Sequence, residues 1–241
     1  MTNGLKVLGI IGARSGSRSI PNKNVRPING KPLFAWIAEA AKESKLLSRV
    51  IMSTDSGEYA QLARARGVET PFLRPAELST DSVPDFDYLF HATQWLEQNE
   101  NWKADIIVRL PPTTPLCTTE HIDGCIQLLI DDPSADSSRT VAPAPKHPYK
   151  LWREIAGYIE PFLPEEYTGL KDAHNLPRQS FPKAFQHVDV IALRRKTLMD
   201  DKSMAGEKVR YLEIPKDEAL DIDTETDFKL AELLLKEKYG S

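Results

Sequence analysis

Short apolar runs alternate with helix-like segments along the first 130 residues of the chain. Three of the runs are rich in Ile and Val, as buried strands are, and they span residues 6–13, 49–55 and 105–111. Between and after them, apolar residues recur every three or four positions, which is the spacing of amphipathic helices. These segments are 32–44, 56–67, 85–98 and 119–131. Because the apolar runs do not alternate with polar residues, we expect an α/β fold with a mostly parallel sheet and helices on both faces.

Residues 131–190 follow a different pattern, with eight prolines, seven aromatic residues and only short strand-like pieces. Those pieces lie at 138–144, 151–162 and 185–193. No internal repeat or low-complexity stretch accompanies them, so we expect the chain, 1–241, to be a single domain with 131–190 as an inserted arm. An extended aromatic arm is often a contact between subunits, and a lid over the core is equally compatible with these residues.

Regular elements return near the end of the chain. A strand is expected at 208–215, and a helix within the segment 221–237. Thr224 can cap that helix, because Asp227 stands three residues later in a capping-box arrangement. The apolar stripe of the helix consists of Phe228, Ala231, Leu234 and Leu235.

The composition is that of an ordinary globular protein, with 41% hydrophobic and 27% charged residues in a chain of 241. The sequence contains no run of about 18 apolar residues that could span a membrane. The N-terminus lacks the pattern of a signal peptide, so we expect a cytoplasmic protein. Cys117 and Cys125 lack C-x-x-C spacing, which favours reduced, buried thiols over a disulfide or a metal pair. The five histidines are scattered and offer no zinc spacing.

Positive charge is concentrated near the start of the chain. The stretch IGARSGSRSIPNKNVRPINGKP, residues 11–32, carries five basic side chains and follows directly on the first expected strand. Residues 1–38 hold six basic residues and no acidic one, although the whole chain has a net charge of −4. Backbone N–H groups and cationic side chains in such a small-residue loop can bind anionic oxygens. We therefore expect this loop to bind a polyphosphate.

Two other interpretations of this stretch are a solvated basic turn and a weak contact with nucleic acid. An acidic chain argues against nucleic acid, because domains that bind it are usually basic. The two familiar phosphate loops are also absent: there is no G-x-x-x-x-G-K-[ST], and Gly12 and Gly16 do not form G-x-G-x-x-G. We expect a phosphate-binding loop of another kind, and no nucleic-acid or membrane partner.

Asp221 and Asp223 form a second candidate site. Side chains two residues apart in an extended segment point to the same face. Both carboxylates can therefore converge on one Mg²⁺, which commonly takes one or two carboxylates together with substrate phosphates. The plainer interpretation is that they are turn and cap acids before the helix. A calcium loop is excluded, because Thr226 stands where the sharp turn of such a loop needs Gly.

Eight blocks, in order along the chain, resemble the cytidylyltransferases that activate acidic keto-sugars. The first, 13-ARSGSRSIPNKN-24, is similar to the A-R-x-G-S-K-G-I-x-x-K-N signature of that family. The others are 30–41, 53–56, 72–81, 112–116, 149–152, 177–179 and 221–228. The resemblance spans nearly the whole chain and is strongest to the acylneuraminate branch, which acts on sialic acid and related nonulosonates.

The resemblance implies a Rossmann-like fold whose inserted arm swaps into the partner of a homodimer. It also implies that CTP and a 2-keto-3-deoxy sugar acid react to give a CMP-sugar and pyrophosphate, with Mg²⁺ held by Asp221 and Asp223. Nucleotide binding is implied for Ala13, Arg14, Ser15, Gly16, Ser17, Arg18, Lys23, Asn24 and Arg74. Sugar binding is implied for Thr113, Thr114, Arg178 and Gln179. Catalytic roles are implied for Arg14, Arg18, Lys23 and Asp223.

The chain departs from the family pattern mainly in the sugar half. Within the signature, Arg18 and Ser19 replace Lys and Gly. In the sugar half, the departures are at Asp85, Pro111, Cys117 and Asp189. The acceptor is therefore expected to be an unusual nonulosonate. The alternatives are an octulosonate or a sugar 1-phosphate as acceptor, and a nucleotide-binding homologue that has lost catalysis. Retention of the basic loop together with the acid pair argues against the last of these.

Overall fold

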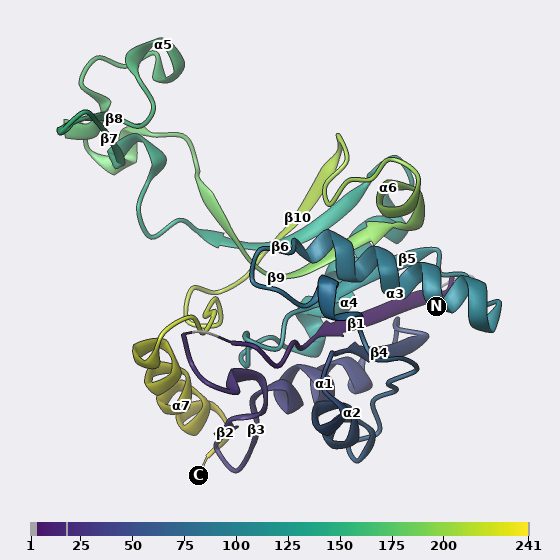
Figure 1. The fold of residues 1–241 in the computed structure, drawn as a ribbon. Coiled ribbons are helices and arrows are strands. Elements are labelled where there is room, and N and C mark those ends of the chain that lie inside the picture. Colours follow the sequence, from purple (N-terminus) through teal and green to yellow (C-terminus); the bar gives the residue numbers. More distant parts are fainter. Residues whose placement is uncertain (1–3, 18, 241) are drawn as a thin grey trace. The chain divides into compact units, whose positions relative to one another are not determined.

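The computed structural model describes residues 4–17 and 19–240, which form two compact units (Figure 1). The first unit contains the chain up to Val141 and again from Val188 onward. The second unit is the segment Ala142–His187. It lies within the range 131–190 that the sequence pattern marks as an arm, and the role of that arm stays a prediction.

A six-stranded sheet forms the centre of the first unit. Its strands, in spatial order, are β10 (Val209–Glu213), β6 (Ser137–Pro143), β9 (Phe185–Arg194), β5 (Ile106–Leu110), β1 (Val7–Gly12) and β4 (Arg49–Ser53). Strand β1 pairs in parallel with β4 and β5, and β10 pairs in parallel with β6, while β9 is antiparallel to β5. The prediction of a mostly parallel sheet is confirmed, and the three apolar runs are the neighbouring strands β5, β1 and β4.

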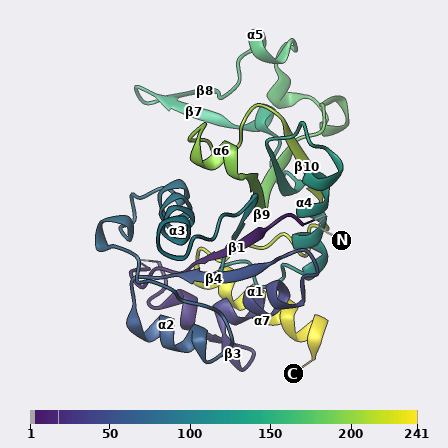
Figure 2. The same cartoon turned by 90° about the vertical axis from the view of Figure 1, so that its right-hand side faces the viewer.

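Helices cover both faces of this sheet, as predicted. They are α1 (Leu33–Glu43), α2 (Gly57–Arg64), α3 (Asp85–Glu100), α4 (Thr119–Asp131) and α6 (Arg195–Met199). A sixth helix of this unit, α7 (Glu225–Tyr239), packs in a separate apolar cluster, and 3-10 turns lie at Lys23–Val25 and Ala76–Leu78. Figure 2 shows α3 on one side of β1 and β4, and α1 and α2 on the other. Of the six helices, only the short α6 has no counterpart in the sequence pattern. No helix in the described ranges is long and apolar enough to cross a bilayer.

The sheet divides the apolar core into two parts. Side chains of α1, α2 and α4 pack on one face, where Phe34 and Ile37 are fully buried. Side chains of α3 and α6 pack on the other face, where Leu89 is fully buried. Because successive strand residues point to opposite faces, Ile11 belongs to the first cluster and Ile10 to the second. The unbroken apolar runs in the sequence therefore reflect burial on both sides of the sheet.

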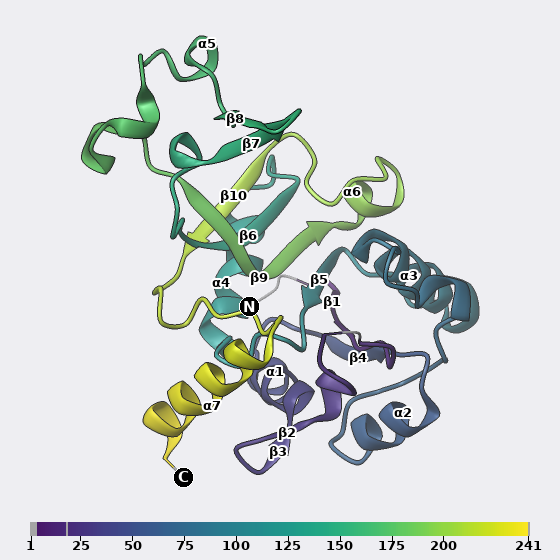
Figure 3. The same cartoon turned by 60° about the vertical axis from the view of Figure 1, so that its left-hand side comes forward.

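A third apolar cluster joins the beginning of the first unit to its end (Figure 3). A tight hairpin of β2 (Pro27–Ile28) and β3 (Lys31–Pro32) turns at Asn29 and Gly30. Both turn residues have positive φ, as the two-residue hairpin turn requires. Apolar residues of this hairpin pack with α7, where Phe228 is buried. Helix α7 therefore packs against the β2–β3 hairpin. This hairpin follows the basic loop, by which we mean residues 13–22 between β1 and the 3-10 turn at Lys23–Val25.

The second unit, residues 142–187, is built around one hairpin. Strands β7 (Trp152–Ile155) and β8 (Tyr158–Pro161) are antiparallel, and helix α5 (Glu165–Thr168) follows them. Its 3-10 turns are Pro148–Lys150, Ala173–Asn175 and Arg178–Ser180. Many of its large apolar side chains are exposed: Leu151, Trp152, Ile155, Tyr158, Ile159, Phe162 and Tyr167. Apolar surface gathered in this way marks places that bind other molecules.

Gly12, the last residue of β1, is closely packed where the strand leads into the basic loop. A Cβ on Gly12 would lie 2.6 Å from Cζ of Tyr88, and Tyr88 is itself buried. We expect Gly12→Ala to lower the free energy of unfolding by about 1–3 kcal/mol, the usual cost of overpacking a core, as measured by urea denaturation. Gly57→Ala is the matched control, because a Cβ on Gly57 meets open space at the start of α2. Equal losses in the two variants would contradict this expectation.

Candidate active site

The loops that follow β1, β4 and β5 lie side by side at one edge of the sheet. Gly12 is in register with Ser53, and Ile11 with Leu110, so the three strands end at nearly the same level. Ligands of parallel sheets bind outside these carboxyl ends. A cavity of about 350 Å³ opens here. Its lining includes Arg14, Ser17, Lys23, Asn24, Arg74, Tyr88, Arg109, Thr113 and Asp223.

Acidic residues from other segments hold the basic loop in place. The carboxylate of Asp55, just after β4, accepts two hydrogen bonds of 2.8 Å from Ser15, one from its amide and one from its hydroxyl. Arg14 forms an ion pair with Asp81 and donates to the carbonyl of Gly16 at 2.9 Å. The loop contains no acidic residue, but Asp55 and Asp81 from other segments partly neutralise its positive charge.

Lys23 connects the loop to the far end of the chain. It lies in the 3-10 turn after the loop and is only 9% exposed. Its ammonium group donates to the carbonyl of Ile222 at 2.5 Å and lies 3.5 Å from the carboxylate of Asp223. Asn24 donates from its side-chain amide to the carbonyl of Arg14 at 2.9 Å. Lys23 is therefore fixed between the basic loop and the acid pair.

Asp221 and Asp223 lie on the same side of an extended segment, as their spacing predicts. Ile222 between them is fully buried, whereas both aspartates reach solvent. The amide of Ile222 donates to the carbonyl of Thr113 at 3.0 Å, which fixes the segment at the cavity. Desolvation of its carboxylate raises the pKa of Asp221, and the nearby negative charge of Asp223 raises it further. Two neighbouring carboxylates that repel one another are suited to Mg²⁺, which prefers oxygen ligands, and of the two Asp223 lines the cavity.

Arg74 forms the wall of the cavity beside β4. Its guanidinium group donates to the carbonyl of Ser53 at 2.6 Å and to the hydroxyl of Ser53 at 3.0 Å. It also stacks over the ring of Tyr88, 4.5 Å from the centroid. Burial lowers the pKa of Arg74, but an arginine stays charged in proteins. The site therefore holds a rigid cationic donor on this side.

A third arginine in the cavity, Arg109, has only a weak signal in the sequence, a single charge within an apolar strand. It donates from Nε to the carboxylate of Asp85 at 2.5 Å and from Nη1 to the carbonyl of Asp189 at 3.1 Å. Thr113 lines the same cavity. Thr114, in contrast, is fully buried, and its hydroxyl donates to the carbonyl three residues earlier at 3.1 Å. The structure therefore separates the two threonines expected at the sugar.

The other expected site residues lie in three places. Those in the basic loop are Ala13, Gly16 and Ser17. Ala13 is buried, and its amide donates to the carbonyl at the end of β4 at 3.0 Å. Arg18, expected to bind and act on the triphosphate, lies outside the described residues. Arg178 and Gln179 belong to the second unit, so their contact with the sugar stays a prediction.

Comparison with known proteins relates the chain to cytidylyltransferases. Residues 8–150 match the sequence profile of the family described as cytidylyltransferase. The chain is 29% identical to post-translational flagellin modification protein B of Campylobacter coli, over 97% of this chain and 96% of that protein. It is 28% identical to CMP-N,N'-diacetyllegionaminic acid synthase of Campylobacter jejuni, again over 97% and 96%. The structure of CMP:2-keto-3-deoxy-manno-octonic acid synthetase in complex with CTP superposes with a TM-score of 0.69 at 20% identity, over 97% of this chain and 99% of that one.

Proposed function

The chain belongs to the cytidylyltransferase family, and we propose that it transfers CMP from CTP to the anomeric hydroxyl of a nonulosonic acid. One observation carries this proposal: the basic loop after β1 and the acid pair near the start of α7 reach the same edge of the sheet, with Lys23 between them. A cationic loop is suited to a triphosphate, and paired carboxylates are suited to its metal ion. A protein that only binds nucleotide has little use for both.

In this proposal the described cations have distinct positions around the triphosphate. Arg14 from the loop and Lys23 from the 3-10 turn after it bind the anionic oxygens, and Asn24 and Arg74 hold the nucleotide. Asp221 and Asp223 would hold Mg²⁺, which neutralises charge on the phosphate oxygens when it is bound. The hydroxyl oxygen of the sugar forms a bond to the α-phosphorus as the bond to the bridging oxygen breaks and pyrophosphate leaves, and the hydroxyl proton passes to a carboxylate of the acid pair or to a water molecule. The protein contributes mainly positioning and electrostatic stabilisation.

The acceptor class is inferred from the relatives that match along nearly their whole length. One of them is named as a synthase of CMP-N,N'-diacetyllegionaminic acid, a nonulosonate. The octulosonate alternative is supported by a structure at 20% identity, which shows the fold alone, and by a 3-deoxy-manno-octulosonate cytidylyltransferase of Bdellovibrio bacteriovorus that is 34% identical, but over only 58% of this chain and 52% of that protein. In the sugar half of the cavity, Arg109 and Asp85 form an ion pair beside Pro111. These groups give that half a polar character suited to a hydroxylated, acidic substrate.

The test is pyrophosphate release from CTP and Mg²⁺ over a panel of acceptors. The panel should contain sialic, legionaminic- and pseudaminic-type acids, an octulosonate and a sugar 1-phosphate. We expect turnover with at least one nonulosonate and none without an acceptor. Turnover confined to the octulosonate or the sugar 1-phosphate would overturn the acceptor class. Turnover with another nucleotide and none with CTP would overturn CMP transfer itself.

We also propose that the second unit joins two copies of the chain in a homodimer. Tyr158 and Tyr167 in this unit are 80% and 74% exposed, and aromatic residues are enriched in the buried centres of interfaces. In analytical ultracentrifugation we expect a dimer, and a shift to monomer for the Tyr158→Lys, Tyr167→Lys double variant. Leu233→Lys is the matched control, because Leu233 is also exposed but lies on α7. A monomeric parent chain would leave this unit the role of a lid.

We place the enzyme in the cytoplasm. Cys117 and Cys125 are free and buried, as the sequence predicts. Free thiols of this kind persist in a reducing compartment.

A further inference from the structure

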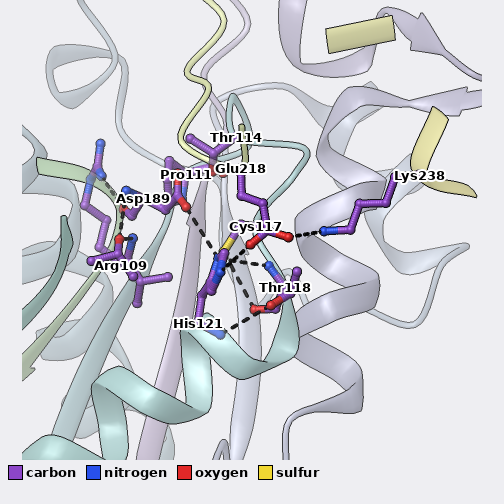
Figure 4. A network of polar contacts seen from close by, with 11 residues as sticks. Arg109, Pro111, Thr114, Cys117, Thr118, His121, Asp189, Glu218 and Lys238 are labelled. Carbon is purple, nitrogen blue, oxygen red and sulfur yellow. Dashed lines mark hydrogen bonds and ion pairs between the residues drawn. The ribbon is translucent and has the colours of Figure 1, made fainter. Parts of the chain in front are cut away.

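A polar cluster at the start of α4 adjoins the cavity described above, because Arg109, which lines that cavity, donates to the backbone carbonyl of Asp189 (Figure 4). Cys117 and His121 stand four residues apart in the sequence, on either side of the helix cap Thr118, and Asp189 reaches them from β9. One possible ligand atom from each of the three lies within 4.8 Å of the other two. All three residues are buried. Thiolate, imidazole and carboxylate are the donor groups of zinc sites.

The carboxylate of Asp189 is the observation that points to a cation. Asp189 is 0% exposed, and neither of its carboxylate oxygens has a hydrogen-bond partner within the described part of the chain. Arg109 donates to its backbone carbonyl and not to its carboxylate. Within the cluster, Nδ1 of His121 lies 3.8 Å from Oδ2 of Asp189, too far for a hydrogen bond. An ionised carboxylate that is buried without a partner is strongly unfavourable, so this group is either protonated or has a cation beside it.

His121 is oriented as a metal-binding histidine. Its Nε2 lies 3.0 Å from the carboxylate of Glu218, which in turn accepts a hydrogen bond of 2.5 Å from Lys238. Its Nδ1 faces Asp189 and the amide of Thr118, which donates to it at 3.4 Å. With its proton on Nε2, the ring has its lone pair on Nδ1; this lone pair accepts the long hydrogen bond from Thr118 and becomes a metal ligand only when that bond is given up. A carboxylate behind the imidazole is the usual arrangement for orienting histidine ligands of zinc.

We propose that Cys117, His121 and Asp189 bind a borderline-soft divalent cation such as Zn²⁺, at a site separate from the acid pair Asp221 and Asp223. Sulfur, nitrogen and oxygen donors together suit Zn²⁺, whereas Mg²⁺ and Ca²⁺ take oxygen ligands. Zinc bonds of about 2.0–2.3 Å require the three side chains to move together by roughly 1 Å. A second cavity, of about 670 Å³, is lined by Cys117 and His121 and gives the ion and a solvent ligand a route to the site.

The test uses Co²⁺ as a spectroscopic probe of the whole chain after treatment with a chelator. A cobalt ion bound to a thiolate gives a near-ultraviolet charge-transfer band, which oxygen ligands such as Asp221 and Asp223 cannot produce. We expect one equivalent of Co²⁺ to give this band, one equivalent of Zn²⁺ to remove it, and a large excess of Mg²⁺ to leave it unchanged. No band at stoichiometric Co²⁺ would overturn the proposal, as would its loss in excess Mg²⁺.

Single substitutions assign the ligands. Cys117→Ser should abolish the band, and Cys125→Ser, which changes the other buried thiol, should keep it. Asp189→Asn should keep the thiolate band but weaken Co²⁺ binding at least about 10-fold. Glu218→Gln should weaken it by about 10–100-fold, as loss of an orienting carboxylate does. A band that survives Cys117→Ser, or unchanged affinity in Asp189→Asn, would overturn the site. If Cys117→Ser does not fold, the Asp189→Asn affinity decides.

Discussion

Replacement of Asp223 by alanine should lower kcat/KM for CTP by at least about 10³-fold at ordinary Mg²⁺ concentrations. A bound metal ion contributes several kcal/mol to the stabilisation of transition-state charge, and each 1.36 kcal/mol corresponds to about a tenfold change in rate. The side chain of Asp223 is 77% exposed, and its backbone amide is held by Asp227 at 3.2 Å. The variant should therefore fold normally. Pyrophosphate release over a range of Mg²⁺ concentrations, together with thermal unfolding, measures both effects.

Glu225→Gln is the matched control for this variant. Glu225 is also an exposed acid in the same segment, and its carboxylate pairs with Arg26 at 2.5 Å. The substitution removes one negative charge, as Asp223→Ala does, but it leaves the acid pair intact. We expect activity within about twofold of the parent chain, because isolated surface ion pairs contribute little. Unchanged activity in Asp223→Ala would remove that residue from the metal site.

Lys23→Met should reduce kcat/KM by about 10²–10³-fold, the usual loss when one preorganised donor is removed from developing charge. Lys23 is almost buried, and its ammonium group donates to the carbonyl of Ile222 at 2.5 Å. Loss of that donor leaves a carbonyl without its partner, so the variant should also lose about 1–3 kcal/mol of stability. Steady-state kinetics with CTP and Mg²⁺ varied separately, and urea denaturation, measure the two effects.

Varying CTP and Mg²⁺ separately distinguishes two possible roles of Lys23. A group that binds the triphosphate changes kcat or the KM for CTP, whereas a group that only holds the segment 221–223 changes the dependence on Mg²⁺ alone. Lys31→Met is the matched control, because Lys31 lies in the same basic stretch but forms an ion pair with Glu39. Its Nζ also lies over the ring of Trp36, 3.5 Å from the centroid. Equal kinetic losses in the two variants would show that only the summed charge of the stretch matters.

The elements that position the site are predictable because their signals are local. The apolar runs specify β1, β4 and β5, and the spacing of apolar residues specifies the helices that follow them. The spacing of Asp221 and Asp223 predicts that both side chains lie on one face, and the burial of Ile222 between the two exposed aspartates agrees with this. Thr224 and Asp227 form the expected capping box. Each of these patterns depends on neighbours within one segment, which the sequence displays directly.

Contacts between distant segments have no comparable signal. The stretch around Arg14 is free of acids in the sequence, but Asp55 and Asp81 reach it from two other loops. Cys117 and Asp189 look like unrelated departures from the family pattern, but the fold brings them together with a histidine. Spacing rules detect metal ligands that cluster along the chain, and these two stand on different elements. Such sites become visible only when the sheet order is known.

The hydrogen bond between Lys23 and the carbonyl of Ile222 joins two segments that the ribosome makes at very different times. The two residues are 199 positions apart. At about 5–20 residues per second, translation separates their appearance by roughly 10–40 s. During that interval the nascent chain carries its cationic loop without the carboxylates that complete the site. If Asp221 and Asp223 hold the metal ion as we propose, turnover begins only after the last helix has left the ribosome and packed.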